Sequence, residues 1–152
     1  MPQTMLDGRV ARHELRPAPD NLTAFFWEAA LRHELAIQKC DGCGYFNHWP
    51  VPRCKKCWST ALSPTKVSGQ ATVYTFAVAT QAFHPWFEPR LPFVVAVIEL
   101  AEQSGLKLVS NVIGCPVDDV HCGMAVEVTF EDVEEGFTLP VFRPAATRGL
   151  RP

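Results

Sequence analysis

The sequence predicts a mainly β protein with an N-terminal helix, built from a cysteine-rich ribbon followed by a five-stranded barrel of the OB type. Two pairs of cysteines lie close together between residues 40 and 57, and the second half carries five short segments of strand composition. Thirteen prolines outnumber nine glycines, which favours short elements joined by stiff turns over long helices. Apolar residues make up 47% of the 152-residue chain and charged residues 20%, as in ordinary globular proteins.

Residues 1–34 are expected to form an arm followed by one amphipathic helix. The arm, residues 1–19, contains three prolines and shows no clear periodicity. Asp20 or Asn21 suits a helix N-cap, and the residues that follow recur on one face at helical spacing. This face consists of Leu22, Phe25, Phe26 and Ala29, with Trp27 beside them. We expect it to pack on the protein's own core, although so many aromatic residues on a short helix also suit an anchor for a partner.

Residues 35–66 hold the strongest motif of the chain. Cys40, Cys43, Cys54 and Cys57 follow the pattern C-x2-C-x10-C-x2-C. Zinc takes four ligands in a tetrahedron, and two cysteines separated by two residues can both reach one ion from a tight turn. Four sulfur ligands leave no open position for water or substrate, so we expect a structural Zn²⁺ ion. Iron in the same shell is the less favoured ion, and disulfides or free thiols are the less favoured use of the cysteines.

Basic residues surround these cysteines. Four thiolates around a dication carry a net negative charge, which Lys39, Arg53, Lys55 and Lys56 would offset. His48 lies between the two pairs, but four sulfurs already fill the shell. We therefore expect His48 to be a surface or packing residue.

Residues 58–68 are expected to link the ribbon to a barrel spanning residues 67–145, with a tail at 146–152. Alternating β-branched and aromatic residues predict four clear strands and a short fifth. The segments are ATVYTFAVAT, PFVVAVIEL, LKLVSNVI, MAVEVTF and LPVFRP. Five short strands suit an OB-fold barrel, whereas a β-sandwich, the alternative, usually needs seven. The acidic run at 131–135 is expected to be a solvated hairpin turn.

Cysteines, a histidine and acidic residues gather in the connection between the third and fourth of these segments. They are Cys115, Asp118, Asp119, His121 and Cys122. Nucleophile, base and acid usually come together from distant segments, so their proximity in sequence is weak evidence for catalysis or for a second metal site. We expect both cysteines to act as small buried hydrophobic residues.

The connection at 81–93, between the first two strands, is rich in aromatic residues and contains three prolines. Its notable side chains are Phe83, His84, Trp86 and Phe87. In OB folds this loop often frames the ligand groove. Two interpretations stay open: the aromatic residues cover the barrel end or the helix, or they form a surface for a partner or ligand.

Charge is distributed unevenly along the chain. Residues 1–68 carry nine Lys or Arg and six Asp or Glu, giving +3, whereas residues 69–152 carry five and ten, giving −5. Nucleic-acid binding depends on neutralising phosphates, so the acidic barrel argues against it. No leader opens the chain, and the longest apolar stretch, LPFVVAVIEL, is too short to span a bilayer. We expect a cytoplasmic protein with no membrane partner, in a compartment that disfavours disulfides.

In this order, the motifs resemble the acyl-CoA-associated OB-fold family with an N-terminal rubredoxin-like zinc ribbon, formerly a domain of unknown function. The resemblance covers nearly everything after residue 20. It rests on FFWEAALRHELAIQKC, CDGCG, PRCKKC, VSGQATVYTFAV, AFHPWF, PFVVAVIEL, LVSNVIGC, GMAVEVTFE and LPVFRPA.

The resemblance implies a zinc ribbon joined to an OB barrel, and a non-catalytic accessory subunit of an acyl-CoA-processing complex. Its partner would be a thiolase-like enzyme (a thiolase, an acyltransferase or a sterol side-chain retro-aldol lyase) or an acyl-CoA hydratase. The subunit would stabilise the partner and help to shape its acyl-CoA site. Coenzyme A phosphates favour basic residues, which are few in the barrel half, so the ribbon's Arg53, Lys55 and Lys56 or the partner would hold them.

Two other functions stay open. One is a nucleic-acid-binding OB protein, which a salt-dependent gel shift would support. The other is an independent acyl-CoA hydratase or hydrolase that uses His84 or the segment from Cys115 to Cys122. Activity of the purified chain that vanishes when His84 or His121 is replaced by alanine would support it.

Overall fold

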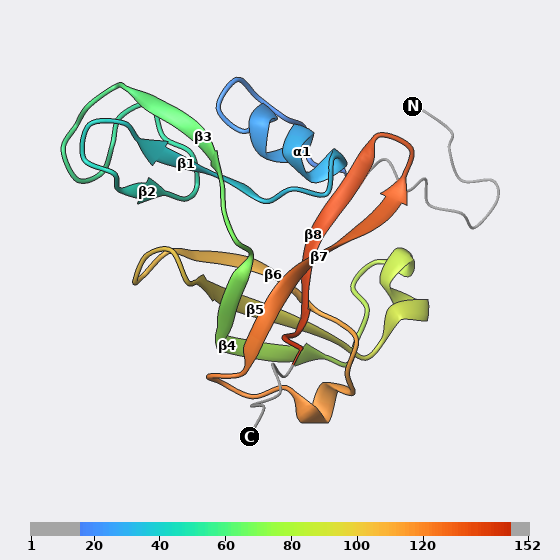
Figure 1. Ribbon diagram of the computed structural model, residues 1–152. Helices are drawn as coiled ribbons and strands as arrows, with labels where there is room; N and C mark the ends of the chain where they lie inside the picture. The colour runs from blue at the N-terminus through green and yellow to red at the C-terminus, as the bar shows by residue number, and fades with distance from the viewer. Residues whose placement is uncertain (1–15, 147–152) are drawn as a thin grey trace, which may run out of the picture.

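The computed structural model describes residues 16–146, in which a three-stranded sheet is followed along the chain by a closed five-stranded barrel (Figure 1). One α-helix precedes the three-stranded sheet and lies beside the hairpin that ends the barrel. The mainly β fold with an N-terminal helix, predicted from the sequence, is confirmed.

Helix α1 spans Ala24–Leu31 and has Thr23 at its N-cap, so the prediction of Asp20 or Asn21 there was wrong; Asp20 instead stabilises the preceding turn. The Asp20 carboxylate accepts hydrogen bonds from the backbone N–H groups of Leu22 (3.0 Å) and Thr23 (2.8 Å). Phe26 is buried and Leu22 is 38% exposed, so only part of the predicted apolar face packs inward.

The three-stranded sheet contains β1 (Ala36–Cys40), β2 (Phe46–Asn47) and β3 (Leu62–Lys66) in the antiparallel order β2-β1-β3. Residues 58–68 are therefore more than the expected link, because β3 pairs along the full length of β1. Pro64 makes β3 difficult to predict from the sequence, because proline is rare inside strands. It is tolerated there because β3 lies at the edge of the sheet.

The barrel is made by five strands in the order β4-β5-β6-β8-β7. They are β4 (Gln70–Ala79), β5 (Phe93–Leu100), β6 (Lys107–Val112), β7 (Ala125–Glu134) and β8 (Phe137–Pro144). All neighbours are antiparallel except β6 and β8, which run parallel and pair where Val112 lies opposite Phe142. The predicted OB-fold barrel is confirmed.

Alternation along the strands separates the barrel core from its outer surface. On β5 every second residue from Val94 to Leu100 is buried, and β8 adds Phe142, which is fully buried. Two short 3-10 helices, η2 (Pro85–Arg90) and η3 (Val117–Asp119), lie in the connections β4–β5 and β6–β7.

The acidic run at 131–135 is mostly strand, so its prediction as a hairpin turn was wrong. Glu131 pairs with Leu139 and Asp132 with Thr138 on β8, and the turn itself lies at Gly136, whose φ is +75°. Acidic side chains are accommodated in this strand because polar partners lie beside them: Arg90 forms an ion pair with Glu131, and His33 Nε2 lies 2.9 Å from Asp132 Oδ1.

No helix among residues 16–146 has both the length and the apolar character that crossing a bilayer requires.

Candidate functional site

The structure gathers the four cysteines of the two C-x2-C pairs at one point. All four Sγ atoms lie within 4.8 Å of one another, with 3.5 Å between Cys40 and Cys57 and 3.6 Å between Cys43 and Cys54. A tetrahedral ion with zinc–sulfur bonds of about 2.3 Å has sulfur–sulfur edges of about 3.8 Å. The thiols therefore fit a single four-coordinate metal ion.

Two turns with the same backbone geometry present these thiols. Gly44 N–H donates to Cys40 C=O at 2.8 Å, and at the equivalent place in the second turn Trp58 N–H donates to Cys54 C=O at 2.9 Å. Both donors have a left-handed backbone, with φ of +72° at Gly44 and +62° at Trp58. Glycine adopts this conformation readily, whereas an indole-bearing residue does so at a cost of about 1 kcal/mol.

Polar side chains tie the segment between the two cysteine pairs to the metal turns. The buried Asn47 accepts a hydrogen bond from Lys55 N–H at 3.0 Å. Gln38 on β1 donates to Val51 C=O at 3.0 Å and accepts from Val51 N–H at 2.9 Å. Residues 47–51 are thus held in place by the ribbon itself.

His48 is a packing residue, as expected, and lies outside the group of converging ligand atoms. Its ring lies 5.9 Å from that of Phe26 and 4.3 Å from that of Trp49, and Nε2 is buried without a hydrogen-bond partner among residues 16–146. Burial, together with the charge of Lys55, lowers the pKa of His48 from 6.5 to about 4. The imidazole is therefore neutral at physiological pH.

A groove of about 530 Å³ lies between η2 and the β7–β8 hairpin. In OB folds the loops at these two places frame the ligand site. Trp86 and Phe87 form one wall, where their rings meet edge to face at 4.9 Å, and Phe87 also stacks on Phe93 at 5.4 Å. Leu139 stands on the opposite wall, so the groove is mainly apolar.

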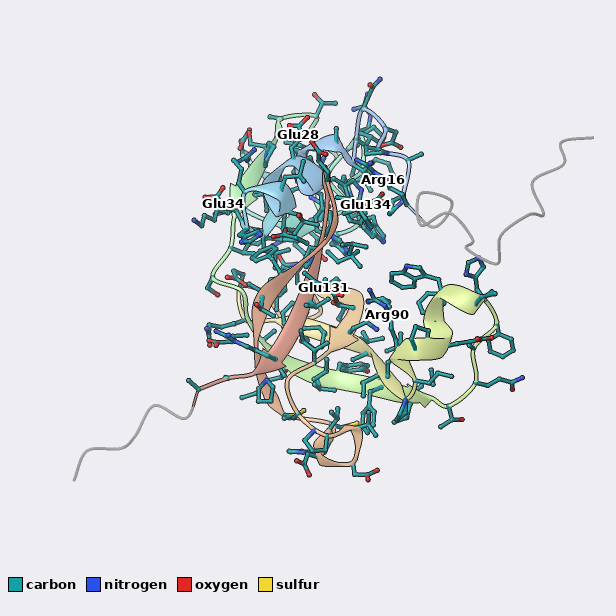
Figure 2. The ribbon with its side chains drawn as sticks, turned by 90° about the vertical axis from the view of Figure 1, so that its right-hand side faces the viewer. Arg16, Glu28, Glu34, Arg90, Glu131 and Glu134 are labelled. Atoms are coloured by element: carbon teal, nitrogen blue, oxygen red, sulfur yellow. The ribbon has the colours of Figure 1, made fainter. Side chains whose placement is uncertain are left out.

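An ion pair joins the two sides of this groove. Arg90 on η2 donates to Glu131 on β7 at 2.9 Å, and its guanidinium lies 3.8 Å above the ring of Trp86. Figure 2 shows these two side chains directed toward each other, with Arg16 and Glu134 farther along the hairpin. The pair fixes the position of η2 relative to the barrel.

The groove continues into a second section of about 470 Å³ between the barrel and the helix. Both sections share Pro17, Asn111 and Leu139 as lining residues. Phe26 of α1 and Trp49 of the ribbon form the far wall. One groove thus runs from η2 along β6 to the ribbon, and the helix, the ribbon and the barrel all line it.

The predicted partner or ligand residues divide into two groups. Trp86 and Phe87 line the groove, whereas Phe83 is 93% exposed and the His84 ring accepts a hydrogen bond from Trp86 N–H at 3.2 Å. The three basic residues of the second metal turn, Arg53, Lys55 and Lys56, are exposed and line neither section. The groove therefore brings together two of the predicted aromatic residues and none of the predicted basic ones.

The cysteines and histidine of the β6–β7 connection form no second cluster among residues 16–146. Cys115 lines the groove, and burial, followed by the charge of Asp119, raises the pKa of its thiol. A raised pKa disfavours the nucleophilic thiolate. His121 and Cys122 are exposed, so the expectation that both cysteines are buried was wrong for Cys122. His121 Nδ1 lies 3.0 Å from Asp119 O.

Several groove residues escaped the sequence analysis. Asn111 donates to Val94 C=O at 2.8 Å, and Arg90 forms the ion pair with Glu131, which lies 41 positions away. The available local signal for Asn111 was a polar residue among the apolar positions of LKLVSNVI, a segment that also holds Lys107 and Ser110. No local signal in the sequence predicted the ion pair, because Arg90 and Glu131 come together only when the barrel closes.

Comparison with known proteins divides the chain into a ribbon and a barrel, as the structure does. Residues 27–63 match the description "ChsH2, rubredoxin-like zinc ribbon domain", and residues 65–131 match "ChsH2, C-terminal OB-fold domain". A solved chain titled "Ltp2-ChsH2(DUF35) aldolase" is 39% identical, with a TM-score of 0.78, over 86% of this chain and 100% of that chain. The chain belongs to the DUF35 family. The resemblance inferred from the sequence motifs is confirmed.

Two curated relatives differ in how much of their own length this DUF35 protein covers. A probable enoyl-CoA hydratase alpha subunit of Thermomonospora curvata is 40% identical over 86% of this chain and 40% of its own length. A DUF35 domain-containing scaffold protein of Methanocaldococcus jannaschii is 35% identical over 68% of this chain and 72% of its own length. This DUF35 protein therefore spans less than half of the hydratase subunit and most of the scaffold protein.

Proposed function

We propose that this protein is a non-catalytic accessory subunit of an acyl-CoA-processing complex. It would stabilise a thiolase-like enzyme, such as a thiolase, an acyltransferase or a sterol side-chain retro-aldol lyase, and would help to shape its acyl-CoA site. The observation that carries the proposal is the match, at 39% identity, to the whole of a chain titled as part of an Ltp2-ChsH2 aldolase. The scaffold name of the 35%-identical archaeal relative supports the same role.

The metal centre is proposed to be structural. Cys40, Cys43, Cys54 and Cys57 would hold one Zn²⁺, for which the sulfur spacing is suitable. Four protein ligands leave the ion no open position, so it would organise the ribbon and take no part in a reaction. In a segment with so few buried residues, metal binding supplies folding free energy that an apolar core would otherwise supply.

The groove is proposed to contribute to the acyl-CoA passage of the complex. Its walls are apolar, as suits an acyl chain, and its aromatic residues Trp86 and Phe87 come from the loop that frames ligand sites in OB folds. The thiol in this groove, Cys115, has a raised pKa, so the reaction itself would belong to the partner. Phe83, Arg53, Lys55 and Lys56 are exposed and His84 is half-buried, and all five would contact the partner or coenzyme A.

Affinity purification of the tagged chain from its native cells, with co-purifying proteins identified by mass, tests the proposal. A thiolase-like enzyme should co-purify in a fixed ratio, and the acyl-CoA reaction should require that enzyme, while the tagged chain alone turns over no acyl-CoA. A tagged variant in which Cys54 is replaced by serine serves as the control and should lose the partner together with the metal. Turnover by the purified chain alone would contradict the proposal.

An acyl-CoA hydratase is a second candidate partner. The match to the enoyl-CoA hydratase alpha subunit covers 86% of this chain but 40% of that subunit, so the remainder of the subunit has no counterpart in the match. If a hydratase protein co-purifies in place of a thiolase-like enzyme, the accessory role stands and the partner class changes.

A further inference from the structure

The outer half of strand β4 has one backbone edge without a partner among residues 16–146. β7 pairs with β4 only from Gln70 to Thr72, and residues 123–124 extend this pairing to Val73. Beyond that point β4 continues toward η2 alongside β5 alone (Figure 1). Within the described part of the chain, residues 74–79 form no backbone hydrogen bond outside the β4–β5 ladder.

The direction of the free groups follows from the ladder between β5 and β6. Leu100 N–H donates to Leu106 C=O at 2.9 Å, and Val94 C=O accepts from the Asn111 side chain of β6 at 2.8 Å. Every second residue of β5, from Val94 to Leu100, therefore directs its backbone groups toward β6.

The residues of β4 opposite these positions cannot be bonded to β5. Phe76 lies opposite Ala96, and Val78 lies opposite Val94. In an antiparallel ladder such pairs are the non-hydrogen-bonded ones, so Phe76 and Val78 direct their N–H and C=O groups away from β5. Two donors and two acceptors are thus spaced as an incoming antiparallel strand requires.

The composition of this edge is unusual for one that faces solvent. Natural edge strands are protected by charged residues, prolines or bulges, whereas residues 74–79, YTFAVA, include no charge and no proline. The bulge of β4 lies between Val73 and Thr75, at the start of the segment. Tyr74 is 54% exposed and Val78 is 37% exposed, so the strand offers apolar side chains as well as backbone groups.

We propose that a partner chain adds an extended, uncharged strand to β4 at Phe76 and Val78. Only an extended backbone can satisfy donors and acceptors at this spacing. The inference rests on the proposed accessory function and names how the partner attaches.

A second copy of this chain fits the edge less well. Self-pairing about Ala77 would place Thr75 opposite Ala79 and Ala77 opposite its own copy, so the face of the new ladder that carries these small side chains would have little cross-strand contact. The net charge of −5 on residues 69–152 would also oppose the approach of two barrels. Large β-branched or aromatic residues on a partner strand would fill the space beside Ala77.

Amide hydrogen exchange on the free chain and on the purified complex tests the proposal. In the free chain, the amides of Phe76 and Val78 should exchange rapidly while those of Thr75 and Ala77 are protected by the β5 ladder. In the complex, Phe76 and Val78 should exchange at least about 100-fold more slowly, since a paired amide exchanges only when its strand opens. Exchange at Gln70 to Val73 should not change.

Substitutions on the same strand give an independent measurement. Val78→Pro removes a free donor while leaving the β5 ladder intact, and Ala77→Lys places a charge beside the edge. Each should weaken partner binding by about tenfold or more, the effect of losing about 1.4 kcal/mol. Thr72→Lys is the matched control, because β7 already covers the edge there, and it should bind normally. Far-UV circular dichroism checks that each variant folds. If Val78→Pro does not fold, the binding measurement on Ala77→Lys tests the proposal in its place.

The outcomes separate this inference from the function on which it rests. A complex in which Phe76 and Val78 still exchange rapidly overturns strand addition and leaves the accessory role intact. Protection that depends on the concentration of the chain alone indicates a second copy and also overturns it. If no complex forms, both proposals fail.

Discussion

Gly69, at the junction of ribbon and barrel, allows a substitution whose cost can be worked out from the structure. Its φ is +76°, and a Cβ added there would lie 2.2 Å from Val128 Cγ1 and 3.0 Å from Val128 Cβ. Val128 N–H also donates to Gly69 C=O at 2.9 Å, which fixes the spacing of the two strands. Gly69→Ala therefore combines a strained backbone with a steric overlap that β7 must move to relieve.

The expected loss follows from these two effects. A left-handed φ costs a residue with a Cβ about 1 kcal/mol, and overpacking of this kind costs about 1–3 kcal/mol. The reduced entropy of the unfolded chain offsets about 0.5 kcal/mol. Gly69→Ala should therefore lower the free energy of unfolding by about 1.5–3.5 kcal/mol.

Urea unfolding followed by tryptophan fluorescence measures this loss, and Gly105→Ala is the control. Gly105 has the same backbone conformation, with φ of +79°, but nothing lies within 4 Å of an added Cβ. Its loss should be about 0.5 kcal/mol, from backbone strain alone. The double variant Gly69→Ala/Val128→Ala should recover part of the overlap energy. Equal losses in the two single variants would refute the reasoning.

Three further predictions concern the metal, the buried histidine and the groove. The purified chain should hold one equivalent of zinc by elemental analysis, and Cys54→Ser should lower this content and the thermal unfolding midpoint together. The pKa of His48 is lowered from 6.5 to about 4, so between these pH values the imidazole is protonated in the unfolded chain and neutral in the folded chain. The free energy of unfolding should therefore fall as the pH drops from 6.5 to about 4. The urea midpoint of His48→Gln should fall less over the same pH range than that of the unsubstituted chain. Phe87→Ala removes an aromatic wall of the groove and should lower acyl-CoA turnover of the purified complex about tenfold, while the subunit ratio stays unchanged.

Features that depend on short stretches of sequence could be predicted without the structure. Two cysteines separated by two residues can only be presented together by a tight turn, so Cys40 and Cys43 are predictable as one half of a metal site. The barrel strands could also be predicted, because a strand with one buried face has an apolar residue at every second position. Residues Val94 to Leu100 show this pattern.

Features created by long-range pairing could not be predicted in the same way. β3 is a strand because β1 offers it an edge, and Pro64 and its polar neighbours give no local sign of it. Glu131 and Asp132 look like turn residues until the barrel brings Arg90 and His33 against them. The groove depends on the same closure, since Asn111 and Leu139 lie on strands that meet only through barrel topology.

The metal turns and the groove are coupled, although the four cysteines of the ribbon line neither groove section. Trp49 forms part of the far groove wall, and it belongs to the segment that Asn47 and Gln38 tie to the metal turns. Phe26 packs against Trp49 at 5.3 Å, and the neighbouring Trp27 lies 5.8 Å from Phe137 of the β7–β8 hairpin. A ribbon without its ion would lose the turns that position Trp49, and α1 would lose one of its two packing surfaces. A closed metal site can therefore affect the reaction of a complex without touching the substrate, because it determines the shape of one end of the groove.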